Sequence, residues 1–372
     1  MKRGLFLALI LALLFTAARA DSLDAGIGQA LDKVDIPALE AASGMQNLRE
    51  LLTRLARGEM VWDGAQAGQA LYQAALGEMR GSFSRMMGLI APSLLCALAG
   101  TLRPRGQGVA QMAENACFLA LAAMMAADMR LYLGEAERAV TRMAELMQTL
   151  FPVLLTLLAA VGATSGAALF KPAVSAASGT MTALVRGVSL RLALGAAVVA
   201  LLDHLSPRMR LSRLSGLLRS AAAWTLGVAF TVFIGVTALQ GVAAAAADGV
   251  GIRAAKYAVD NLVPVVGGMF ADTMDTLVGC ALLVKNALGV TGLAMLLSVA
   301  GLPMLRTLCA VLLYRGCAAL LQPVVQDRLS GMIHAFSEVL MLLFIIELSV
   351  GAMFLLLVAQ MLTVGNAAVG LR

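Results

Sequence analysis

Ionisable side chains stand inside an apolar stretch of this 372-residue chain, between Asn261 and Asn286. Asn261 can cap a helix whose first turn tolerates proline, and the residues that follow are apolar enough to cross a bilayer. At about 100° per residue, one arc of roughly 60° collects small and polar side chains, with Lys285 to its side: Gly268, Asp272, Asp275, Gly279 and Asn286. A carboxylate in lipid would cost several kcal/mol, so this stripe is expected to face other helices or a wet cavity.

Two interpretations of the stripe remain open, a polar seam for helix packing and the lining of a transport path. Glu347 poses the same question, because it lies near the middle of the apolar run Phe336–Leu362. Its charge could be neutralised by Arg191, Lys285 or Arg306, or by a proton. Glu347 therefore joins the candidates as one half of a structural pair or as part of a proton or substrate relay.

The elements that position these residues are predicted to be membrane helices. Hydrophobic residues make up 60% of the chain and charged residues 13%, and no alternating pattern indicates strands. We predict an all-α, polytopic helical membrane protein with about 7–9 membrane segments, some of them re-entrant in one alternative. The net charge of +6 gathers in short loops, which is typical of membrane orientation and not of nucleic-acid binding.

The chain divides into three parts. Residues 1–20 read as a cleavable signal peptide, with Lys2 and Arg3 before an apolar run and cleavage after Ala20, although an uncleaved first span is the alternative. Residues 21–83 are predicted to form a short extracytoplasmic helical region, whose leucines at 48, 51, 52 and 55 recur at helical spacing. It is too small to bury much core alone, so it should pack on the membrane part or on a partner. Residues 84–372 form the polytopic transmembrane domain.

The order of spans follows from the basic loops. Met86–Leu102 is the first predicted span, Ala116–Leu133 returns, and the charges of 135–145 form an external link before Met147–Phe170 spans again. Lys171–His204 should then be a re-entrant pair or two short helices, unless Ala116–Leu133 fails to cross. After Asn286, the neighbourhood of Pro303 and Arg306 suggests a hairpin of spans or a re-entrant element.

A cluster of arginines in the segment Ser206–Ser220 is expected on the cytoplasmic side: Arg208, Arg210, Arg213 and Arg219. With leucines between them, they suit a helix lying on an anionic inner leaflet. A plain positive-inside loop and a docking surface for a cytoplasmic partner are the alternatives.

Motifs for an enzyme are absent from the sequence. It contains no phosphate-binding G-x-x-x-x-G-K-[ST] loop, no H-E-x-x-H and no G-x-S-x-G. Its five cysteines lie in apolar runs without metal-ligand spacing, and its two histidines are predicted to be interfacial. We therefore predict no enzymatic activity, no catalytic residues, no cofactor and no metal site.

The chain resembles the stage III sporulation protein AE family of endospore-forming bacteria. The resemblance rests on the signal peptide, on NLRELLTRLARGE (Asn47–Glu59), and above all on one block of residues: Lys256-Tyr257-Ala258, Asn261, Pro264-Val265-Val266-Gly267-Gly268, Asp272, Asp275, Gly279-Cys280, Lys285-Asn286 and Gly289. The similarity covers essentially the whole mature chain, and it brings no catalytic residue with it.

The resemblance implies a multipass protein of the mother-cell membrane that surrounds the forespore. Partners would be other proteins of the same operon, including a cytoplasmic secretion-type ATPase and ring-forming components, and indirectly the forespore protein called stage II sporulation protein Q. The assembly would act as a channel or secretion-like complex for endospore formation, with this chain as its export-gate or permease-like part. An autonomous secondary transporter and a purely structural scaffold are the alternatives.

Overall fold

A computed structural model describes most of the chain. It covers residues 27–28, 31–32, 34–43, 47–57, 69, 73, 76–81, 83–84, 87–88, 90–95, 107–205, 211–262, 267–323, 325 and 327–370. For 248–262, 267–277 and 364–370 the description is of the backbone alone. The predicted signal peptide, most of the predicted span Met86–Leu102, Arg208 and Arg210 lie outside the described residues.

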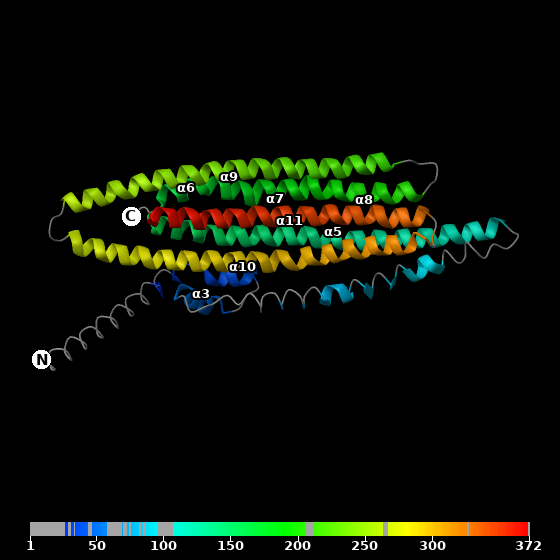
Figure 1. Cartoon of the computed structure of the whole chain (residues 1–372), viewed down its shortest axis with the longest axis horizontal. Coiled ribbons are helices and arrows are strands. Elements are labelled where there is room, and N and C mark those ends of the chain that lie inside the picture. Colours follow the sequence, from blue (N-terminus) through cyan, green and yellow to red (C-terminus); the bar gives the residue numbers. More distant parts are fainter. Residues whose placement is uncertain are drawn as a thin grey trace, which may run out of the picture.

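Long antiparallel helices dominate the described structure, and strands are absent from it (Figure 1). They are α5 (Gln107–Ala160), α9 (Ser212–Leu262), α10 (Gly267–Leu321) and α11 (Asp327–Gly370). Between α5 and α9, a column of shorter segments runs the length of the bundle: α6 (Thr164–Ser175), η1 (Ala176–Met181), α7 (Thr182–Leu184), η2 (Val185–Ser189) and α8 (Leu190–Leu205). The all-helical fold predicted from the composition is confirmed for the described residues.

Two predicted interruptions are absent, and ion pairs with neighbouring segments neutralise charges in both places. The link expected at 135–145 is wrong, since α5 continues through it from Gln107 to Ala160, with Glu135 bonded to Arg306 and Glu137 to Arg186. The break expected near Pro303 and Arg306 is also wrong, since α10 runs unbroken from Gly267 to Leu321. Packed neighbours let a helix keep a proline and a charge that would otherwise favour a loop.

The segment 171–204 does not form the re-entrant pair or the two separate helices that parity suggested. It stays in one column with α6–α8, in which the π-helical η1 and η2 hold one extra residue per turn without turning the chain back. The other alternative, in which Ala116–Leu133 fails to cross, stays a prediction, and the structure places this stretch within α5. At the end of α5, Gly162 has φ 94°, and Ala163 N–H donates to the Leu158 carbonyl over 3.1 Å, which closes the turn into α6.

Five helices among the described residues are long and apolar enough to cross a membrane. Their apolar parts are Asn115–Ala160, Gly179–His204, Ser212–Ala244, Val278–Leu321 and Asp327–Thr363. The prediction of 7–9 segments divided two of these helices, α5 and α10, into pairs of spans. A membrane protein with several apolar helices is therefore confirmed, and the higher count is not.

The arginine-rich segment before α9 is not a separate surface helix in its described part. Ser212 begins α9, and the first turns already pack on neighbours: Ser215 Oγ donates to the Ala196 carbonyl over 3.1 Å, and Arg219 pairs with Glu338. These first turns belong to the continuous helix α9 because Ser215 is buried and Arg219 pairs with a carboxylate on α11.

The N-terminal helices α2 (Ile36–Ser43) and α3 (Leu48–Ala56) pack on α5 and α10. Leu48 and Leu52 are buried and Leu51 and Leu55 are partly buried, so the predicted apolar face is confirmed. The opposite face is charged, with Arg49 paired to Asp32 at 2.7 Å and side chains 62% and 64% exposed. This side of the bundle therefore presents a solvated surface, because such charges would not be stable in lipid.

Glycines bring α10, α11 and α5 into close contact. A Cβ at Gly289 would lie 2.1 Å from Leu362 Cδ2, one at Gly292 would lie 2.6 Å from Leu150 Cδ2, and one at Gly351 would lie 2.7 Å from Met304 Cε. Small residues at such crossings are how membrane helices pack without a hydrophobic drive between them.

Candidate functional site

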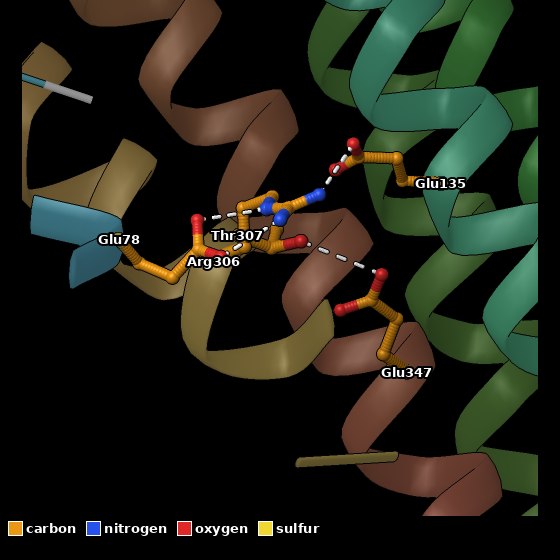
Figure 2. A network of polar contacts seen from close by, with 5 residues as sticks. All are labelled: Glu78, Glu135, Arg306, Thr307 and Glu347. Atoms are coloured by element: carbon orange, nitrogen blue, oxygen red, sulfur yellow. Dashed lines mark hydrogen bonds and ion pairs between the residues drawn. The ribbon is translucent and has the colours of Figure 1, made fainter. Parts of the chain in front are cut away.

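Arg306 on α10 lies at the centre of a polar network inside the described bundle (Figure 2). Its Nε donates to Glu78 Oε2 over 2.8 Å and its Nη2 to Glu78 Oε1 over 2.7 Å. On the opposite side, its Nη1 donates to Glu135 Oε1 on α5 over 2.8 Å. The side chains are 31% exposed for Arg306 and 19% for each glutamate, so these bonds form largely away from water. One arginine thus ties the N-terminal part, α5 and α10 together.

Glu347 lies next to this network on α11 and is fully buried. Thr307, the residue after Arg306, donates its Oγ1 hydrogen to Glu347 Oε1 over a long 3.4 Å (Figure 2). The second oxygen, Oε2, is buried without a hydrogen-bond partner in the structure, and so is Glu135 Oε2. The predicted ion pair of Glu347 with Arg191, Lys285 or Arg306 is therefore wrong for the described structure: Arg306 is engaged by Glu78 and Glu135.

Lys285 forms a second buried polar contact, nearer the start of α10. It is 1% exposed, and its Nζ donates to the Leu362 carbonyl of α11 over 3.0 Å. The neighbouring Asn286 is half-buried and its Oδ1 has no hydrogen-bond partner among the described atoms. Gly279 is half-buried with open space around it. These residues lie along α10, and their role in packing or in a path stays a prediction.

The rest of the predicted stripe lies where the structure describes the backbone alone. Gly268, Asp272 and Asp275 belong to the first turns of α10. The structure does not describe the side chains of Asp272 and Asp275, so the stripe as a whole stays a prediction.

The arginine cluster is only partly described. Arg213 is exposed in the first turn of α9. Arg219 is 27% exposed and its guanidinium donates to Glu338 of α11. Arg219 therefore stabilises the bundle, and a role of the cluster in docking or lipid contact stays a prediction.

Polar hollows flank α5 on two sides at the level of the Arg306 network. One, of about 680 Å³, lies between α5 and the η1–α8 column, and Arg186 crosses it to pair with Glu137 at 3.1 Å. The other, of about 800 Å³, lies between α2, α5 and α10. It is lined by Glu135, Arg138, Arg142 and Arg306 among others, and Glu145 lines both hollows. The helix α5 therefore has a hollow with charged side chains in its wall on each of two sides.

Sequence reasoning missed Glu78 and Glu135 as members of the network. Glu78 lies in the predicted extracytoplasmic region 21–83, and Glu135 lies in the predicted external link. Arg306 in an apolar run was the available signal, since a buried guanidinium requires carboxylate partners. Their positions, 228 and 171 residues away in sequence, could not be read from local spacing.

The Arg306 network combines one guanidinium, one hydroxyl and three carboxyl groups. Within the described part of the chain, no group of three or more His, Cys, Asp or Glu side chains is arranged to hold a metal ion. Both oxygens of Glu78 and one of Glu135 accept from the Arg306 guanidinium, and one oxygen of Glu347 accepts from the Thr307 hydroxyl.

Comparisons with known proteins agree with the resemblance. The family model for stage III sporulation protein AE matches residues 46–365. Stage III sporulation protein AE of Bacillus subtilis (strain 168) is 28% identical over 300 residues, which cover 80% of this chain and 75% of that protein. No solved structure matches the chain. The family match extends over most of the chain, including the Arg306 network and Glu347, and the chain belongs to the stage III sporulation protein AE family.

Proposed function

We propose that this protein is the multipass membrane component of a channel or secretion-like complex between mother cell and forespore, and that it forms the export-gate or permease-like part. Membership of the family indicates a role in sporulation and association with the stage III sporulation machinery. Its location would be the mother-cell membrane around the forespore. Partners would include the cytoplasmic ATPase and the ring-forming components of the same operon, with an indirect link to stage II sporulation protein Q.

The observation that carries the gate proposal is the pair of polar hollows beside α5. Both hollows are lined by charged side chains of helices that are apolar enough to cross a membrane. A scaffold needs only complementary apolar surfaces, whereas charges kept at membrane depth generally serve a path or a partner.

Deletion of the gene in its spore-forming host tests the assignment to the complex. We expect engulfment to proceed and the forespore to fail afterwards, with heat-resistant spores restored by a plasmid copy. Normal spore counts in the deletion strain would reject the assignment.

Reconstitution separates the gate from an autonomous secondary transporter. If the chain works only within the complex, liposomes containing the purified protein alone should not accumulate small solutes in response to an ion gradient. Solute uptake by such liposomes would favour the transporter, in which Asp272, Asp275, Lys285 and Glu347 would couple the ion to the solute.

A further inference from the structure

The Arg306 network contains three carboxyl groups and one guanidinium. Glu78 and Glu135 flank one guanidinium, which donates to both, and Glu347 lies beside Thr307, the next residue along α10 (Figure 2). With all three ionised, the interior would hold two more negative charges than positive ones. Two carboxylate oxygens, Glu135 Oε2 and Glu347 Oε2, are already buried without a hydrogen-bond partner.

Glu347 differs from the other two glutamates because none of the described cations pairs with it. It is 0% exposed, and its contact is the Thr307 hydroxyl at 3.4 Å. An isolated carboxylate moved out of water carries a very large solvation cost, and such a group takes up a proton instead.

The charged groups on the helices around α11 are occupied elsewhere or exposed. On α10, Arg306 serves Glu78 and Glu135, and Lys285 donates to the Leu362 carbonyl. On α9, Arg219 pairs with Glu338. The cations of α6 and α8, Lys171 and Arg191, are exposed, and Glu135 of α5 adds a negative charge. The described surroundings of Glu347 therefore favour its neutral form.

We propose that the Arg306 network is a proton-binding site and that Glu347 holds the proton at neutral pH. Protonation removes the buried charge from Glu347, whose Oε2 is buried without a hydrogen-bond partner among the described residues. Release of the proton leaves a buried charge at the contact between α10 and α11, so deprotonation must be accompanied by entry of water or separation of these helices. The proposal goes beyond the gate function and holds for the isolated protein.

Infrared spectroscopy of the full chain in lipid nanodiscs tests this directly. The wild-type spectrum at pH near 7 should contain the carbonyl band of a protonated carboxylic acid, and E347Q should lose it. The matched control is E137Q on α5, whose carboxylate is 52% exposed and paired with Arg186, and this variant should keep the band. Titration of the wild type to alkaline pH should remove the same band, a result that needs no variant.

Three results would overturn the proposal. The wild-type and E347Q spectra could coincide in the carboxylic-acid region, which would mean that Glu347 is ionised at rest. The band could persist in E347Q and vanish in E137Q, which would place the proton elsewhere. Exchange of potassium for sodium at constant pH could abolish the band, which would show a metal cation in place of the proton. None of these readings depends on a role in sporulation.

Discussion

Arg306 is the residue on which the buried polar network depends. It neutralises two carboxylates that come from different parts of the chain, Glu78 and Glu135. Removing one partner of such a set leaves charges uncompensated, which costs more than the contact itself contributes. The pairing of Arg306 therefore explains how α10 can contain a charged residue inside an apolar bundle and still form one continuous helix.

Replacement of Arg306 by glutamine should destabilise the protein by about 1–3 kcal/mol, because both glutamates lose their charged donor in a poorly hydrated site. Thermal unfolding in detergent measures the change. The control is R49Q, which removes a pair whose side chains are 62% and 64% exposed, and it should cost less than about 1 kcal/mol. Equal effects of the two substitutions would contradict a buried role for Arg306.

At the level of elements, the close contact between helices α10 and α11 depends on glycine, which has no side chain at the crossing. Gly289 lets Leu362 approach to a distance at which a Cβ would overlap it. Gly301 lies on the same helix with open space around it. The two glycines thus provide a matched pair for testing close packing.

Substitution of Gly289 by alanine should lower stability by about 1–3 kcal/mol through overpacking, whereas G301A should be neutral or slightly stabilising, because alanine favours helix. Thermal unfolding in detergent again gives the comparison. The double variant G289A/L362A should recover part of the loss, since the overlapping side chain is removed. If G289A did not lower the stability and L362A did not change the effect of G289A, the close approach of Leu362 to Gly289 would be contradicted.

Sequence reasoning reached the helical class, the membrane setting and the buried position of Glu347, because each follows from composition or from one charge in an apolar run. It failed where the outcome depended on a distant partner. Pro303 and Arg306 look like a break until Glu78 and Glu135 are known to reach the guanidinium. The charges within α5 resemble those of a loop for the same reason. The π-helical turns of η1 and η2 produce no pattern that can be recognised from the spacing of residues in the sequence.

The whole molecule is longer than a bilayer is thick. The 54 residues of α5 extend about 80 Å, against a hydrocarbon core of about 30 Å. Much of the bundle must therefore lie outside the lipid or beside other protein. Ser212 and Asp327 lie at one end, where α9 and α11 begin, and Thr164 lies at the other, where α6 begins (Figure 1).

Single cysteines at these exposed positions should report this arrangement once the native cysteines are replaced. A membrane-impermeant thiol reagent added from outside should label the Thr164→Cys variant, while the variants at Ser212 and Asp327 should react only after the membrane is opened. The basic residues before α9 favour the cytoplasm for their end. Labelling of all three positions from the same side would contradict the antiparallel bundle as a membrane-spanning unit.

The central claim is that the ionisable groups inside the helices serve the path of a sporulation complex and not only its packing. The most direct measurement is the yield of heat-resistant spores from a deletion strain carrying D272N, D275N or E347Q, with membrane levels of each variant measured alongside. We expect spore yield to fall at least tenfold while the protein level stays normal, because the amides keep the side-chain shape and remove the titratable group. Normal yields from all three variants would contradict the claim and leave a structural scaffold.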